Sequence, residues 1–239
     1  MPDELEAPGT DAAPEWASLY RARGDEVVVH RPIFTGDVFI GVSIAGETTA
    51  RNVIILQHPC AIRAGVNLLP KLLVAEVNQA PKLMPSDWPK GTYKQLPLAE
   101  LIPEAKASDH AALLAKNHLV TPTELAAATR IACLSQRGVN LLMQRWVNHN
   151  TRVVIATQRY QEVSAPQFEE ADMTEDWCTD RDDDGVSAEA ATIEIDGWLK
   201  EKNAIGESRQ DRLKDEQQRS ALRSELRAHL RSVRAVANA

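Results

Sequence analysis

The amino-acid sequence predicts an α+β fold: a small antiparallel, barrel-like β-sheet followed by helices and a C-terminal amphipathic helix. Three observations favour this fold class. Short β-branched runs recur between residues 25 and 78 with tight turns and no long helix between them, which is typical of antiparallel sheets. Thr121, Pro122 and Glu124 have the spacing of a helix start. Leucines recur at helical spacing near the C-terminus.

Four runs carry the predicted sheet, over residues 25–30, 36–44, 52–57 and 72–77. The third run is continuously apolar between Asn52 and Gln57, so we expect it to be a central strand. Residues 79–106 contain five prolines and predict a long loop with an edge strand near 93–98. Residues 151–156 return to strand character and are expected to complete the sheet.

The helical part is predicted to begin near residue 109 and to end near residue 148. One helix is expected over 125–136, directly after the start at Thr121. Gly138 is expected to separate this helix from a second one over 139–147, because glycine is a poor helix former.

Composition and charge limit the classes of protein. The 239 residues are 44% hydrophobic, which is normal for a globular protein, and the net charge of −7 argues against a strongly basic nucleic-acid-binding protein. No apolar run approaches the roughly 18 residues that span a bilayer, and the segment up to Trp16 lacks the regions of a signal peptide. The three cysteines lie far apart and form no metal motif. We therefore expect a cytoplasmic protein with no membrane contact, metal or cofactor.

The uneven distribution of charge predicts four parts of the chain. Residues 1–20 are acidic and contain prolines, so we expect a disordered leader. Residues 21–160 are the predicted α+β core. Residues 161–198 are expected to form an acidic linker, and residues 199–239 a basic, amphipathic helical tail.

The sharpest local pattern is the turn from Gln57 to Arg63, which follows the most apolar run. His58 and Cys60 are two residues apart with a proline between them, and Arg63 follows closely. In a catalytic interpretation Cys60 is a thiolate nucleophile, with His58 and Arg63 as its neighbours. In the structural interpretation the cysteine is buried and the histidine satisfies backbone groups of the turn.

A second polar pattern crosses a predicted helix end and contains Arg145, His149 and Arg152. Arg145 and His149 lie within one helical turn and Arg152 follows closely, and such a cluster predicts an anion-binding site, because guanidinium groups bind phosphate through paired hydrogen bonds. Cationic side chains at a helix C-terminus are also favoured by the helix dipole and by the unpaired carbonyls there. Both interpretations are compatible with the sequence.

The predicted tail helix combines an apolar stripe with a basic one. The stripe contains Leu222, Leu226 and Leu230, and Arg219 and Arg223 stand beside it. We expect these five residues to bind a protein partner or a second copy of the chain. The arginines could also cover the acidic residues 162–184 of the same chain, or meet nucleic-acid phosphates.

The N-terminal strands resemble the opening of the PemK/MazF-type toxin barrels. The resemblance covers about 50 residues. It is carried by Arg31-Pro32, by Gly36-Asp37-Val38-Phe39, and by the apolar run over 53–56. It implies a small SH3-like barrel, an activity that cuts RNA, and an anion-binding role for Arg51 near the position of the family's arginine. The loop over 45–50 carries no arginine, and residues 57–60 stand where the family has Ser or Thr.

Three classes of function remain open from the sequence. The first is a binding module within a larger assembly, with a protein partner and nucleic acid as its expected contacts. The second is a toxin-like ribonuclease of the PemK/MazF type. The third is a cysteine-dependent enzyme that uses Cys60.

Overall fold

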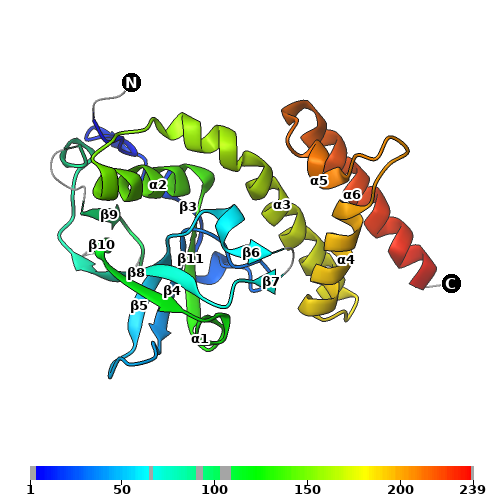
Figure 1. Ribbon diagram of the computed structural model, residues 1–239, viewed down its shortest axis with the longest axis horizontal. Helices are drawn as coiled ribbons and strands as arrows, with labels where there is room; N and C mark the ends of the chain where they lie inside the picture. The colour runs from blue at the N-terminus through cyan, green and yellow to red at the C-terminus, as the bar shows by residue number, and fades with distance from the viewer. Residues whose placement is uncertain (1–3, 65–66, 90–93, 103–108, 238–239) are drawn as a thin grey trace. The chain divides into compact units, whose positions relative to one another are not determined.

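The computed structural model describes residues 4–64, 67–89, 94–102 and 109–237 (Figure 1). The fold is α+β, as predicted. The chain divides into two compact units. Unit 1 consists of residues 1–27, 33–63 and 68–163, and unit 2 of residues 28–32, 64–67 and 164–239. In the part of the chain that the structure describes, no helix is long and apolar enough to cross a membrane.

Unit 1 is built on a seven-stranded antiparallel sheet that curls into a half-barrel. The strands lie in the order β3–β11–β4–β5–β8–β10–β9. Their bounds are Tyr20–Arg23 for β3, Asp37–Val42 for β4, Arg51–Ile55 for β5, Leu72–Ala80 for β8, Gln95–Leu98 for β9, Asp109–Val120 for β10 and Thr129–Leu134 for β11. The apolar run at β5 is the middle strand of the seven, as the sequence predicts.

Two short ribbons, four 3₁₀ turns and two helices complete this part of the chain. The ribbons pair β1 (Gly9–Thr10) with β2 (Ala13–Pro14) and β6 (Arg63–Ala64) with β7 (Asn67–Leu68). The 3₁₀ turns are η1 (Trp16–Leu19), η2 (Gly24–Glu26), η3 (Pro59–Ala61) and η4 (Pro85–Asp87), and the helices are α1 (Pro122–Ala126) and α2 (Gln136–Thr151). The predicted start of α1 is confirmed, because Thr121 and Glu124 cap each other's backbone amides.

Several predicted elements of unit 1 were wrong. Residues 109–120 form a strand instead of a helix, and α1 ends after five residues, so that β11 occupies half of the predicted helix over 125–136. No strand forms over 25–30 or 151–156. The Ala- and Leu-rich run of β10 suits a helix locally, but pairing with β8 on one side and β9 on the other decides for a strand. The predicted edge strand is confirmed as β9 over 95–98; residue 93 lies outside the described residues.

The N-terminal acidic segment is folded, which corrects the expected disordered leader. Leu5, Trp16 and Leu19 are buried, and Glu6 is held by hydrogen bonds from Gln144 and Thr157. The prediction of disorder rested on the acidic composition and overlooked these apolar side chains. Their burial offsets the loss of conformational entropy on folding, which would otherwise leave an acidic segment disordered.

Gly138 lies inside α2 and does not break it. A Cβ atom at this position would come within 2.2 Å of the Leu19 carbonyl oxygen, so the glycine permits a close approach of η1.

We expect Gly138→Ala to lower the free energy of unfolding by about 1–3 kcal/mol, as overpacking does, although alanine is the better helix former. Gly197→Ala is the matched control, because nothing lies within 4 Å of its added Cβ in helix α4 (Ala188–Lys200). Urea unfolding should show the control unchanged or stabilised; equal effects would contradict the close-approach explanation.

Unit 2 contains helices where a linker was expected. The helices are α3 (Thr157–Asp183, in unit 2 from Ser164 on), α4, α5 (Arg209–Arg212) and α6 (Glu216–Ala237). Their shared core contains Met173, Trp177, Cys178, Ala191, Ile195, Trp198, Leu199, Leu213, Leu222, Leu226 and Leu230. The residues expected as an acidic linker and those of the basic tail therefore form one bundle, because Trp177, Ile195 and Trp198 stand between the acids and supply its core.

Ion pairs connect the acidic and basic segments within unit 2. Arg223 contacts Glu169 at 2.7 Å, and Arg234 contacts Asp184 at 3.0 Å. Arg31, whose side chain is nearly inaccessible, contacts Glu175 at 2.6 Å. The basic tail thus contacts acidic residues of its own chain, which is one of the contacts predicted for it.

Candidate functional site

A buried carboxylate in the middle of the sheet is the most unusual feature of unit 1. Glu76 is only 6% exposed and lies in β8 directly opposite Val53 of β5. Directly opposite residues point to the same face of a sheet, and Val53 belongs to the apolar core together with Leu72 and Val74. A carboxylate on a core-facing side needs charged or hydrogen-bonding partners to offset its desolvation.

Four side chains supply these partners, and together with Glu76 we name them the Glu76 cluster. His118 Nε2 lies 3.0 Å from Glu76 Oε1, and Lys116 Nζ lies 3.6 Å from Oε2. Arg51 Nε is 4.0 Å from Oε1. Asn78 Nδ2 donates a hydrogen bond of 3.4 Å to Oε2. Three neighbouring strands therefore bring one acid, three basic groups and an amide together.

Strand register explains why these side chains meet. His118 of β10 stands opposite Val74 of β8, which is two residues before Glu76. Arg51 of β5 is two residues before Val53, which stands opposite Glu76. Side chains alternate along a strand, so His118 and Arg51 lie on the same face as Glu76. Diagonal neighbours of this kind are within reach of long side chains across a sheet. Along β8 this face carries apolar side chains at the Leu72 end and a polar one at Asn78. The Glu76 cluster lies at the boundary between the apolar and the polar part.

A wide bulge in β10 brings Lys116 to the cluster. Leu113 pairs with Glu76 and Asn117 pairs with Ala75, so three residues of β10 have no counterpart on β8. Leu114 anchors the bulge in the core, and its carbonyl accepts a hydrogen bond from the Asn117 side chain. Bulges are common beside active sites, because they redirect a side chain that a regular strand would point elsewhere.

Exposure increases outward through the cluster. The Glu76 side chain is 8% exposed, that of His118 19%, that of Arg51 37% and that of Lys116 58%. Glu47 also contacts Arg51, at 2.8 Å. The acid is therefore at the bottom and the basic groups are at the rim, which is an arrangement suited to an anion from solvent.

The contact with Glu76 assigns the tautomer of His118. An ionised carboxylate only accepts hydrogen bonds, so Nε2 carries the proton and Nδ1 of the neutral ring is the basic nitrogen. Burial by itself raises the pKa of the Glu76 carboxyl. The hydrogen bond from His118 and the charges of Lys116 and Arg51 outweigh this effect, so the pKa is lowered and the carboxylate stays ionised.

The lowered pKa of Glu76 gives a pH-dependent contribution to stability. A carboxyl whose pKa is lower in the folded chain stabilises the fold above its unfolded pKa of about 4.3, and this contribution is lost as the pH falls through the folded value. We therefore expect the unfolding free energy of the native chain to fall more steeply below about pH 5 than that of Glu76→Gln. Urea titrations at a series of pH values measure this difference. Parallel curves for the two proteins would show that Glu76 is not held as a carboxylate.

The predicted turn over 57–63 uses its polar groups to hold the backbone. His58 Nδ1 accepts a hydrogen bond from the Cys60 amide, and burial lowers the His58 pKa. Gln57 Oε1 accepts from the Leu73 amide at 2.7 Å, and Arg63 donates to the Ile33 carbonyl at 2.7 Å. The Cys60 side chain is exposed rather than buried. These contacts match the structural interpretation for His58 and Arg63; the catalytic role of the turn stays a prediction.

Three of the four residues predicted to bind an anion lie near the end of α2 and have different surroundings; the fourth, Arg51, lies beside Glu76. The Arg145 guanidinium is fully buried, lies 4.8 Å from the Trp88 ring centre, and has its pKa lowered to about 9 by burial. His149 stacks on Trp146, and Arg152 is exposed with left-handed backbone at the end of α2. The structure therefore gives Arg145 an interior, structural position, apart from the exposed end of the helix.

The predicted partner-binding residues of the tail are used within unit 2. Leu222, Leu226 and Leu230 lie in its core, and Arg219 donates to the Leu213 carbonyl at 2.9 Å. Arg223 is engaged by Glu169. The apolar stripe is therefore covered by the chain itself.

Sequence reasoning missed most of the Glu76 cluster. Only Arg51 was singled out, through the family resemblance, and the structure places it beside Glu76 instead of His58 or Cys60. The available signal was Glu76 itself, a lone charge inside the apolar run over 72–77. Lys116 and His118 were hidden because their segment was predicted to be helical.

The fold and the cluster define a half-barrel protein in which a buried carboxylate on an inner strand is paired with a partly buried histidine. No protein-family model matches the chain, and no curated protein matches it. Among the described residues, no group of three or more histidine, cysteine or acidic side chains is placed to hold a metal ion.

Proposed function

We propose that unit 1 is a toxin-like ribonuclease that cuts single-stranded RNA at the Glu76 cluster. The observation that carries this proposal is the hydrogen bond between buried Glu76 and His118, with Lys116 and Arg51 beside it. A histidine oriented by a carboxylate is a general base, and two nearby cations are suited to a phosphate. The resemblance to the PemK/MazF-type toxins implies the same class of reaction.

In the proposed reaction His118 is the catalytic base. Its Nδ1 atom takes the proton of a ribose 2′-hydroxyl, and the oxygen attacks the adjacent phosphorus. The bond from phosphorus to the 5′-oxygen of the next nucleotide breaks, and water protonates that oxygen. The products are a 2′,3′-cyclic phosphate and a 5′-hydroxyl. Glu76 is a positioning residue that holds the tautomer and stabilises the imidazolium that forms.

In the proposed reaction Lys116 and Arg51 provide electrostatic stabilisation of the transition state. Negative charge accumulates on the phosphoryl oxygens as the 2′-oxygen attacks, and fixed cations stabilise this charge without reorganising. Lys116 is the more exposed of the two and can meet a phosphate entering from solvent, while Arg51 is held in place by Glu47. Single-stranded RNA suits such a site, because its backbone is free to align for the attack.

The test uses the full chain with an RNA oligonucleotide and a DNA oligonucleotide of the same sequence. RNA should be cut to fragments that end in a 2′,3′-cyclic phosphate, whereas DNA should stay intact because it lacks the 2′-hydroxyl. Cleavage should persist in EDTA, since side chains supply the positive charge. RNA that binds and is not cut would replace this proposal with a nucleic-acid-binding module, and no interaction with RNA would refute both.

A further inference from the structure

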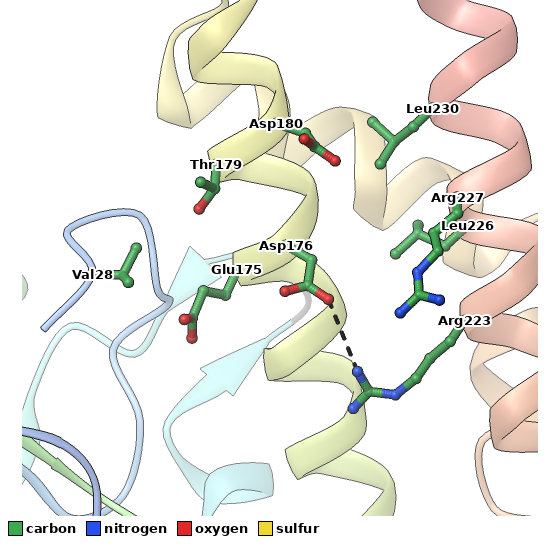
Figure 2. Close-up of a pocket in the computed structure, with 9 residues that line it drawn as sticks. All are labelled: Val28, Glu175, Asp176, Thr179, Asp180, Arg223, Leu226, Arg227 and Leu230. Carbon is green, nitrogen blue, oxygen red and sulfur yellow. Dashed lines mark ion pairs between the residues drawn. The ribbon is translucent and has the colours of Figure 1, made fainter. Parts of the chain in front are cut away.

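A groove lies within unit 2 between α3 and α6 (Figure 2). It has a volume of about 350 Å³. Leu226 and Leu230 of α6 supply apolar lining, and Val28 from the 28–32 segment lines it as well. Val29, the next residue, is 84% exposed, which is unusual for a β-branched apolar side chain. The groove therefore offers both apolar contact and a charged lining.

The two helices give the groove opposite charges. Asp176 and Asp180 come from α3, and Arg223 and Arg227 come from α6, as Figure 2 shows. Both aspartates are about half exposed. An acidic side and a basic side face the same opening.

The charged side chains on the two sides of the groove differ in the ion pairs that they form within the chain. Arg223 contacts Glu169 at 2.7 Å and reaches Asp176 only at 3.9 Å, and Asp180 contacts Arg234 at 3.6 Å. The exposed Arg227 differs: among the residues that the structure describes, no hydrogen bond or ion pair of its side chain is found. Arg227 thus lines the groove as a cation that forms no ion pair or hydrogen bond with the described residues of its own chain.

We propose that this groove is a self-association surface whose occupant is the same groove of a second copy of the chain. In a two-fold symmetric contact, residue i of one copy meets residue j of the other, and j meets i. An acidic side next to a basic side is complementary to itself under this operation, so Arg227 of each copy meets Asp176 and Asp180 of the other. A nucleic acid fits less well, because the aspartates would repel its phosphates.

The apolar residues complete the contact. Val28 lines the groove, and the exposed Val29 follows it directly in the chain. A second copy that covers this segment would remove apolar surface from water. The paired charges then fix the register of the two copies, which is the usual contribution of charge complementarity at an interface.

Sedimentation velocity of the full chain tests the proposal through a charge exchange. The native chain should form a dimer, and Arg227→Glu and Asp176→Lys should each weaken it by roughly tenfold or more, because each places like charges together twice. Mixing the two variants should restore a dimer, since both contacts then join opposite charges. Asp176 is chosen because it lines the groove from α3 and its side chain is about half exposed.

The matched control is Arg231→Glu, which makes the same charge change at an exposed position one turn further along α6, outside the groove. It should leave the dimer unchanged, and circular dichroism should show that all variants are folded. A native chain that stays monomeric at every concentration would overturn the proposal. So would a dimer that Arg227→Glu and Arg231→Glu weaken equally, or a mixture of the two groove variants that stays dissociated.

Discussion

Replacing His118 by alanine is expected to reduce the rate of RNA cleavage by about 10²- to 10⁴-fold, the range that loss of a general base produces. The fold should be kept, because Lys116 and Asn78 still contact Glu76 after the imidazole is removed. Single-turnover cleavage of a labelled RNA oligonucleotide measures the effect, and binding of an uncleavable RNA with 2′-deoxyribose at the cut site checks that the substrate still binds.

Glu76→Gln tests the positioning role separately. The glutamine amide can donate to Nε2 of His118, which favours the tautomer with the proton on Nδ1 and removes the base from the substrate side. Cleavage should fall although the shape of the site is preserved. His58→Ala is the control for location, since it removes the histidine of the predicted catalytic turn. Full activity of His118→Ala together with loss of activity in His58→Ala would move the catalytic site to that turn.

Replacing Leu222 by aspartate is expected to unfold the helical bundle of unit 2. Leu222 is fully buried in the bundle core together with Trp177 and Trp198. The change loses the burial of a leucine, at about 2–5 kcal/mol, and adds the cost of an unpaired buried charge. Such a sum is comparable with the whole unfolding free energy of a small domain, which is about 5–15 kcal/mol. Thermal melts followed by circular dichroism and tryptophan fluorescence measure it.

Ser224→Asp is the control for this experiment. Ser224 is exposed on the same helix, so the same charge there should change the melting temperature little. Equal melting of the two variants would show that α6 does not pack through its leucine stripe.

Local patterns predicted the elements whose cause is local. Thr121 and Glu124 marked the start of α1 because a capping box satisfies amides within one turn. The apolar run up to Leu56 marked a central strand, and the spacing of Leu222, Leu226 and Leu230 marked the buried side of α6. In each case residues close in sequence carry the whole signal.

The errors lie where distant segments decide the outcome. The run of β10 contains Ala111, Ala112, Leu113 and Leu114, whose helix preference is overridden by hydrogen bonding to β8 and β9. Gly138 was expected to end a helix, whereas its role is to admit the Leu19 carbonyl from a segment more than a hundred residues earlier. No local window of the sequence contains either partner.

The sequence by itself determined the α+β class, the central strand and the amphipathic character of the last helix, because these follow from hydrophobic periodicity and capping. Only the tertiary structure decided where the candidate chemistry lies. Arg51, Glu76 and His118 belong to three strands. The register of those strands, together with the bulge before Asn117, brings Arg51 and His118 within 4.0 Å of the Glu76 carboxylate. Strand register is fixed by the packing of the whole sheet, and a shift of one residue would point these side chains to the opposite face.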